Sequence, residues 1–303
     1  MSVTVRVPAK VNVQLAVGAA RPDGFHDLAN VFLAVGLYDE VTVEEAPAFE
    51  ITCTGPGSDQ VPLDRTNLAA RAAIALAERH GLGGDGPGEP KVRIHIAKDI
   101  PVAGGMAGGS ADAAGALLAC DALWGTGASR DELLDICAEL GSDVPFSLVG
   151  GAALGTGRGE KLDVLDVRGQ FWWVFAVADG GLSTPAVYRE FDRLTPDAPE
   201  PVASPALLEA LRTGDASALA ATVTNDLQPA ALSLFPSLKA TLDAGTGAGA
   251  LAALVSGSGP TTAFLAADEA AARRVAAALT ASGTCRTARV AASPAPGASL
   301  VTG

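Results

Sequence analysis

The sequence lacks several features that would place it in common functional classes. Its four cysteines are scattered, with no C-x-x-C pair, and its three histidines have no metal-ligand spacing with the cysteines or with one another. No apolar run approaches the ~20 residues of a membrane-spanning helix. The first residues lack the charged and apolar regions of a secretory leader. These absences predict a cytoplasmic protein with buried free thiols, no metal cluster and no membrane partner.

Positive charge is also scarce. The 303 residues include 21 Lys and Arg against 34 Asp and Glu, a formal net charge of −13. A general nucleic-acid binder needs a basic face, so this balance argues against a nucleic-acid partner. A locally basic pocket could still bind a small phosphorylated molecule. Apolar residues make up 49% and charged residues 18% of the chain, which is enough for a sizeable core. At this length two domains are more common than one core.

Glycine, in contrast, is concentrated in one segment. Four glycines precede Ser110 within residues 101–110, after a strand-like alternation at 92–97 and before a helical pattern at 111–124. Such a turn into a helix N-terminus can cradle phosphate, and a side chain at Gly108 or Gly109 is expected to intrude there. Neither GxxxxGK[ST] nor GxGxxG is present. A flexible loop of small residues beside a tightly packed helix therefore stays an alternative.

The remaining patterns mix strands and helices without strict alternation, which favours α+β domains over a doubly wound sheet. A Gly-rich segment at 155–161 predicts a domain boundary, with domains at 1–160 and 161–292 and a flexible tail at 293–303. The run at 171–178 is typical of a strand covered on both faces. Other expected strands cover 2–7, 11–17, 41–45, 50–54, 152–156, 251–256, 262–266 and 287–292. Expected helices cover 129–140, 206–244, 268–282 and 67–80, and Thr66 is expected to cap the last of these.

Three motifs stand in a definite order along the chain. Pro8-Ala-Lys-Val-Asn12 comes first, the glycine-rich loop second, and Ser256-Gly-Ser-Gly-Pro260 third. This order resembles the GHMP superfamily of small-molecule kinases over most of the chain. The resemblance implies a two-domain α+β fold. Its N-terminal ATP-binding domain has a ribosomal-protein-S5-like βαβ core, and its C-terminal domain is a ferredoxin-like α/β domain.

Further segments are similar to one branch of that family. They are Arg-Pro-Asp-Gly-Phe-His-Asp-Leu at 21–28, Gly-Gly-Ser at 108–110 where sister kinases tend to have Ser-Ser, Leu-Gly-Ser-Asp-Val-Pro at 140–145, and Asn-Asp-Leu-Gln-Pro at 225–229. The resemblance implies ATP- and Mg²⁺-dependent phosphorylation of the 2-hydroxyl of a cytidine diphosphate-linked methylerythritol, in non-mevalonate isoprenoid synthesis, by a monomer or homodimer. The alternatives are another GHMP kinase, or a non-catalytic nucleotide-binding sensor that would lack the catalytic acid or lysine.

The resemblance also implies roles for individual residues. Asp143 becomes the catalytic base and Lys10 its charge partner, although the local sequence alone favours a helix cap and leaves a surface lysine open. Phe25 and Tyr188 would stack on the cytosine, and His26 would hydrogen-bond to its edge. Asn12, Phe32 and Thr184 are further candidates for that pocket.

The nucleotide side is assigned in the same way. Asn67 and Lys98 match positions near the adenine, and Ser110 and Asp112 are candidate magnesium ligands. Ala107 carries a Cβ, so a negative φ is expected there unless the backbone is strained. The motif at 256–260 is expected to pack against the phosphate loop. The loop itself would be formed by Pro101, Val102, Ala103, Gly104, Gly105, Met106, Ala107, Gly108, Gly109, Ser110 and Ala111.

Overall fold

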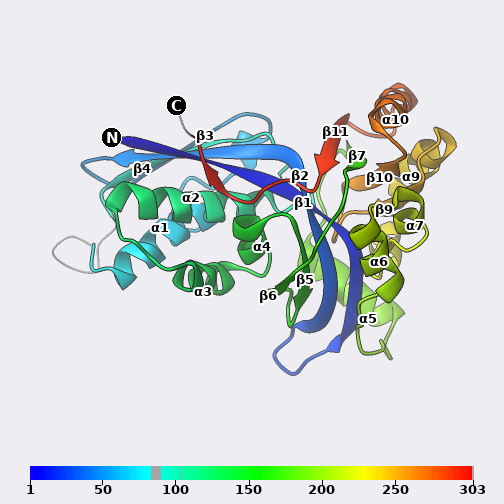
Figure 1. The fold of residues 1–303 in the computed structure, drawn as a ribbon, viewed down its shortest axis with the longest axis horizontal. Helices are drawn as coiled ribbons and strands as arrows, with labels where there is room; N and C mark the ends of the chain where they lie inside the picture. Colours follow the sequence, from blue (N-terminus) through cyan, green and yellow to red (C-terminus); the bar gives the residue numbers. More distant parts are fainter. Residues whose placement is uncertain (83–89, 103, 302–303) are drawn as a thin grey trace.

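A computed structural model describes residues 1–82, 90–102 and 104–301, and it contains two sheets with helices packed around them (Figure 1). Ala103, predicted to belong to the phosphate loop, lies outside the described residues. The first sheet has the strand order β12-β1-β2-β4-β3. Its strands are β1 (Ser2–Ala20), β2 (His26–Glu45), β3 (Glu50–Thr54), β4 (Val92–Ala97) and β12 (Ser299–Leu300), with β5 (Ala152–Thr156), β6 (Lys161–Val164) and β8 (Thr224–Asn225) off this path.

The long hairpin of β1 and β2 connects the two halves of the molecule. Its pairing shifts register near Pro8, Asn12 and Val17, as β-bulges do, and bulges bend and twist a strand. One end of the hairpin pairs with β4 and the other with β5. The hairpin descends beside α5 in Figure 1. Residues of the predicted strands 2–7 and 11–17 therefore belong to one bent strand.

Four helices follow β3 and β4 and cover one face of the first sheet (Figure 1). The central one, α2, approaches β1 and β2 closely because its sequence is rich in Ala and Gly. A Cβ added at Gly115 would lie 2.8 Å from a methyl carbon of both Val7 and Val41. Glycine is therefore required by packing at this position. The helices are α1 (Leu68–Arg79), α2 (Gly108–Trp124), α3 (Arg130–Leu140) and α4 (Val144–Val149), with a 3₁₀ turn, η1, at Ser58–Gln60.

The second sheet is antiparallel, in the order β11-β7-β10-β9. Strand β7 is buried along both faces, as predicted. Trp173 and Phe175 belong to the core shared with the first sheet, whereas Val174 and Ala176 pack in the core of the second half. Its elements are β7 (Phe171–Val177), β9 (Ala252–Val255), β10 (Thr262–Ala266), β11 (Thr287–Ser293), α5 (Thr184–Leu194), α6 (Pro205–Thr213), α7 (Ala216–Ala220), α8 (Gln228–Leu234), α9 (Leu238–Gly247) and α10 (Glu269–Ser282).

The C-terminal segment differs from the predicted flexible tail. The backbone N–H of Ala295 donates to Ala34, and its carbonyl accepts from Gly151. Farther on, β12 pairs with β1, so residues 294–301 return to the first sheet. Strand β6 also extends that sheet beyond the predicted boundary at residue 160. The prediction of a flexible tail rested on amino-acid composition, which does not show that the backbone of this segment hydrogen-bonds to the first sheet. Among the described residues no helix is long and apolar enough to cross a membrane.

Substituting Gly115 tests the close packing of α2. We expect Gly115→Ala to lower the free energy of unfolding by about 1–3 kcal/mol, because overpacking against two stiff valines outweighs the gain in helix propensity. Gly247→Ala is the matched control, since a Cβ there meets nothing within 4 Å. Urea unfolding of both variants measures the difference. Equal stability of the two variants would contradict the close approach.

Candidate active site

The predicted catalytic residues line a cavity of about 700 Å³ to which both halves of the chain contribute. Its walls come from the β1–β2 hairpin, the glycine-rich loop, the start of α4, the helix α5 and the loop before β10. The predicted site residues that line it are Lys10, Asn12, Phe25, His26, Gly104, Gly105, Ala107, Gly108, Gly109, Ser110, Asp143, Thr184 and Tyr188. Phe32, Met106 and Ala111 are fully buried behind these walls, and Pro101 and Val102 lie outside them.

A buried lysine and a partly open carboxylate form the polar centre of this cavity. Lys10 Nζ lies 3.5 Å from Asp143 Oδ2 and donates to Asn12 Oδ1 at 2.6 Å. Lys10 and Asn12 are two residues apart in β1. Asn12 in turn donates to Asn30 Oδ1 at 2.7 Å. Lys10 also lies over the ring of Phe32, 5.9 Å from its centroid. Phe32 is buried beside Lys10 and does not line the cavity, so its predicted place in the acceptor pocket stays a prediction.

Asp143 occupies the position of a helix cap without acting as one. It is the N-cap residue of α4, as the local sequence suggests, but its side chain makes no capping hydrogen bond. The side chain is about one-third exposed and points toward Lys10. A carboxylate in this position can accept a proton from a hydroxyl group bound in the cavity.

The glycine-rich loop enters α2 through a left-handed residue. Ala107 has φ 61° and is the one non-glycine residue with positive φ in the described part of the chain, so the exception of a strained backbone applies there. The contacts of its neighbours impose this conformation. Gly105 approaches the loop before β10 so closely that a Cβ would lie 2.1 Å from the carbonyl oxygen of Ser256. Strain of this kind persists where surrounding structure over-determines the backbone, often at ligand sites.

The first turn of α2 faces the cavity with Gly108, Gly109 and Ser110. A helix N-terminus carries partial positive charge and free N–H groups, which favours an anion. The two glycines are not equivalent. A Cβ at Gly108 would point inward, 3.1 Å from Lys98 Nζ, whereas one at Gly109 would meet only Leu68, at 3.8 Å. Intrusion on a phosphate therefore stays a prediction for Gly109, whereas a side chain at Gly108 would meet Lys98 and Ile100 inside the protein.

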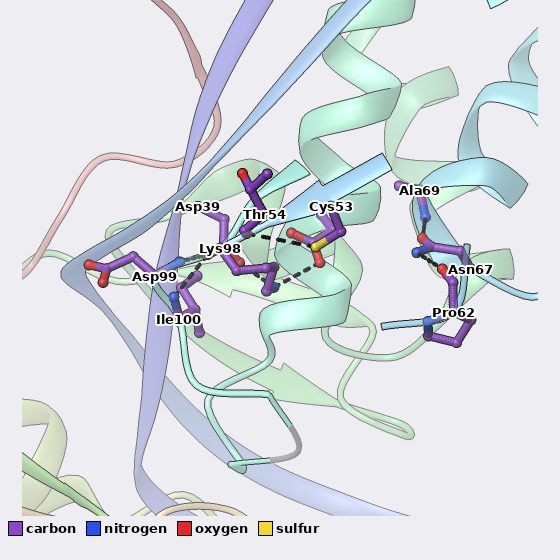
Figure 2. Close-up of polar contacts among 10 residues, drawn as sticks. Asp39, Cys53, Thr54, Pro62, Asn67, Ala69, Lys98, Asp99 and Ile100 are labelled. Atoms are coloured by element: carbon purple, nitrogen blue, oxygen red, sulfur yellow. Dashed lines mark hydrogen bonds and ion pairs between the residues drawn. The ribbon is translucent and has the colours of Figure 1, made fainter. Parts of the chain in front are cut away.

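Lys98 lies beneath this loop in a buried cluster of charges (Figure 2). Its ammonium contacts Asp39 and lies 2.8 Å from Asp112 Oδ2, with 1% of the side chain exposed. Asp39 also accepts hydrogen bonds from the backbone N–H groups of Asp99 and Ile100. Burial raises the pKa of Asp112; Lys98 opposes the shift, and the negative charge of Asp39 adds to it. The ammonium group of Lys98 therefore stabilises the loop through its ion pairs with Asp39 and Asp112.

Asn67 likewise has a structural role in this structure. It is the N-cap of α1, the position predicted for Thr66, and its Oδ1 accepts from Ala69 N at 2.8 Å (Figure 2). Its Nδ2 donates to the carbonyl of Pro62. Neither Asn67 nor Lys98 lines the cavity. The contact of Asn67 and Lys98 with adenine stays a prediction. In this structure the polar side-chain atoms of both residues bind partners within the protein.

The cavity is also lined by the residues predicted to bind a base. The rings of His26 and Tyr188 are 4.8 Å apart and tilted by 35°. Burial raises the pKa of Tyr188, and the charge of Asp143 adds to the shift. Phe25 is half exposed, with the guanidinium of Arg158 4.9 Å above its ring. Thr184 Oγ1 lies 2.9 Å from Ser258 Oγ, which joins α5 to the loop before β10.

Several residues that line the cavity were not predicted as site residues. Among the charged ones are Arg158, Arg189 and Asp192. The glycines around Arg158 were interpreted as a domain boundary, although a cation between glycines also suits an anion site. Asp192 follows Tyr188 by four residues, and this helical spacing could have placed it on the same face of α5.

Comparison with known proteins agrees with this geometry. The family model described as GHMP kinases N terminal domain matches residues 67–151, and the model described as GHMP kinases C terminal matches residues 207–285. The 4-diphosphocytidyl-2-C-methyl-D-erythritol kinase of Streptomyces avermitilis is 78% identical, with 99% of this chain and 100% of the relative covered. The enzyme of the same name from Streptomyces coelicolor is 73% identical over the same shares.

Solved structures show the same relationship. A crystal structure of 4-(cytidine 5'-diphospho)-2C-methyl-D-erythritol kinase has a TM-score of 0.76 and 34% identity, and covers 99% of this chain and 100% of its own. A homoserine kinase from Cytophaga hutchinsonii also has a TM-score of 0.76 but 20% identity, covers 99% and 97%, and shows the shared fold. The two-domain α+β fold is thus confirmed, and the chain belongs to the GHMP kinases, within them to the 4-diphosphocytidyl-2-C-methyl-D-erythritol kinases.

Proposed function

We propose that Asp143 and Lys10 catalyse phosphoryl transfer from ATP to the 2-hydroxyl of 4-diphosphocytidyl-2-C-methyl-D-erythritol. The chain is a small-molecule kinase of non-mevalonate isoprenoid synthesis, as its family membership establishes. The observation that carries the residue assignment is the 3.5 Å contact between Lys10 Nζ and Asp143 Oδ2 inside a cavity that also holds the N-terminus of α2. The action of the protein as a monomer or homodimer, without nucleic-acid or membrane partners, is part of the proposal.

Asp143, Lys10 and the first turn of α2 would each have a different role during phosphoryl transfer. The 2-hydroxyl oxygen forms a bond to the terminal phosphorus of ATP, the bond to the ADP oxygen breaks, and Asp143 accepts the hydroxyl proton. The positive charge of Lys10 offsets the negative charge that develops on the phosphoryl group. The first turn of α2, with Gly109 and Ser110, binds phosphate oxygens through its N–H groups.

Magnesium belongs to the proposal as the ion that accompanies ATP. The described residues contain no group of three or more His, Cys, Asp or Glu side chains able to hold a metal by themselves. Of the two predicted ligands, Asp112 is paired with Lys98, whereas Ser110 lines the cavity. A hydroxyl beside phosphates fits Mg²⁺, which usually binds substrate phosphates, waters and one or two protein oxygens. The Ser110 hydroxyl would hold the ion, which neutralises phosphate charge when bound.

The acceptor would extend from Asp143 to the aromatic end of the cavity. We assign Phe25 and Tyr188 to stacking on the cytosine, His26 to its hydrogen-bonding edge, and Asn12 and Thr184 to the walls between. Arg158 and Arg189 add positive charge that suits the diphosphate of the acceptor. Stacking on an aromatic side chain contributes about 1–3 kcal/mol per base.

The function is tested by ADP release with ATP and the cytidyl acceptor, compared with 2-C-methyl-D-erythritol phosphate, which lacks the cytidine. We expect efficient turnover of the first and little of the second. Preference for mevalonate phosphate or homoserine would instead identify another GHMP kinase, and ATP binding without turnover of any alcohol would identify a nucleotide sensor.

Replacing the proposed base tests the chemistry. We expect Asp143→Asn to retain the fold and the binding of both substrates but to lose about 10²–10⁴-fold in kcat, because an amide cannot accept the proton. Steady-state kinetics and titration of the acceptor measure the two effects separately. The control is Asp131→Asn, an exposed change at the start of α3 outside the cavity. Turnover within a few-fold of wild type in Asp143→Asn would remove this residue from the mechanism.

Two neighbouring glycines test the phosphate cradle. We expect Gly109→Val to raise the KM for ATP at least about tenfold without loss of stability, because its side chain enters the cavity next to Leu68. Gly108→Val should instead lower the free energy of unfolding, because its side chain meets Lys98 and Ile100. ATP kinetics and urea unfolding of both variants distinguish the outcomes. An unchanged KM for ATP in Gly109→Val would contradict the cradle.

A further inference from the structure

We infer that Asp192 is a positioning residue that makes the acceptor pocket select cytosine over uracil by fixing the tautomer of His26. The inference rests on the proposed binding of the acceptor's base at His26. Three observations carry it. Asp192 contacts His26 Nε2, the imidazole ring is packed between aromatic side chains, and His26 Nδ1 has no hydrogen-bond partner among the described residues.

The contact is direct and comes from one face of α5. Asp192 Oδ1 lies 2.8 Å from His26 Nε2. Tyr188, one helical turn earlier, packs its ring against the same imidazole at 4.8 Å. Phe191 meets the imidazole edge-on at 6.1 Å. Only 5% of the His26 side chain is exposed. The helix therefore holds the ring by its face and edge, and a 180° flip of the ring would break the contact of Nε2 with Asp192, because the flip exchanges each nitrogen with a ring carbon.

The partner of Nε2 determines what Nδ1 can do. An ionised carboxylate only accepts hydrogen bonds, so His26 Nε2 carries the hydrogen and the neutral ring has a lone pair at Nδ1. No hydrogen bond among the described residues engages Nδ1, and Nδ1 is not one of the fully buried side-chain atoms left unpaired. His26 also lines the cavity. Nδ1 is thus a hydrogen-bond acceptor that a bound base can reach.

An acceptor at this point distinguishes the two pyrimidines. Cytosine has an exocyclic amino group that donates, and uracil has a carbonyl oxygen at the same position that only accepts. Two acceptors that face each other leave both unpaired in a water-poor pocket, which is costlier than a missing contact. Asp192 would therefore add the discrimination that stacking by Phe25 and Tyr188 cannot supply, because every base has a stacking face.

Asp192 has no competing cation in the described part of the chain. Arg158 and Arg189 line the same cavity, but neither lies within 4.0 Å of its carboxylate. The side chain is 39% exposed, so its second oxygen can remain hydrated. A carboxylate bound to one histidine and to water fits a role in setting the hydrogen on that histidine.

The test compares cytidyl and uridyl acceptors by ADP release at saturating ATP and pH 8. We expect wild type to prefer the cytidyl acceptor. We expect Asp192→Asn to lower the ratio of the two kcat/KM values at least about tenfold, because its amide can also donate to Nε2 and allow a hydrogen on Nδ1. The kcat for saturating cytidyl acceptor should change only a few-fold. Asp192→Glu, which keeps a carboxylate, should retain most of the preference.

Two variants separate this role from general damage. Glu190→Gln removes a charge from the same helix, but Glu190 contacts Arg193 and Ser233 instead of the cavity, so the ratio should stay that of wild type. Tyr188→Ala should raise the KM of both acceptors and lower their ratio less than Asp192→Asn does, because it loosens the ring but leaves the Asp192 contact with Nε2 in place. Imidazole ¹⁵N spectra should show a hydrogen on Nε2 of His26 in wild type and a mixture of tautomers in Asp192→Asn.

The outcomes distinguish the two levels of the proposal. A folded Asp192→Asn with the wild-type ratio, or a wild type that uses both acceptors equally, overturns the role of Asp192. A wild-type spectrum with the hydrogen on Nδ1 overturns it as well. A wild type that phosphorylates neither nucleotide acceptor overturns the proposed function itself.

Discussion

The arrangement of the glycine-rich loop depends on the buried charge of Lys98. Its ammonium joins Asp39 of β2 to Asp112 of α2, and the carboxylate of Asp39 also accepts hydrogen bonds from the backbone N–H groups just after Lys98. A buried charge that loses its partner destabilises a protein by about 3–5 kcal/mol. The end of β4, the loop and the start of α2 are therefore restricted to one mutual arrangement. These charges hold the N-terminus of α2 in a position that faces the cavity. The loop is therefore held in this arrangement by the protein itself and does not need a bound phosphate to order it.

The second wall of the site comes from the C-terminal half and is joined to the first by the backbone. Ser256 donates from its hydroxyl to the carbonyl of Gly105 at 3.1 Å, which confirms the prediction that this motif packs against the phosphate loop. The side-chain amide of Asn225 donates to the carbonyls of Val255 and Gly257. A Cβ at Gly257 would lie 3.4 Å from Lys10 Nζ. Together with the core shared between the two sheets, these contacts tie Lys10 to both halves of the chain.

Local signals in the sequence predicted the short elements, and long-range contacts decided the rest. The helices predicted at 129–140 and 268–282 are present, and the side chains of Ser129 and Asp268 cap them. The full length of β2 was missed because its central residues are buried on both faces and show no alternation. Lys98 was interpreted as a ligand contact because a sequence does not show that Asp39 and Asp112 converge on it. Asp192 was not predicted as a site residue because an acidic residue on a helix usually faces solvent.

The charge of the chain and the charge of its substrates have the same sign, and this conflict explains the composition of the cavity. The net charge of −13 disfavours the approach of nucleotides at long range. Such repulsion is screened beyond about 8–10 Å at physiological salt. Binding then depends on groups inside that distance: Lys10, Arg158 and Arg189 along the walls and the N-terminus of α2. The acids among them, Asp143 and Asp192, each contact a partner, a lysine and a histidine. Both carboxylates can therefore lie beside anionic ligands, and in the proposed mechanism each directs a proton, Asp143 at the reacting hydroxyl and Asp192 at the base.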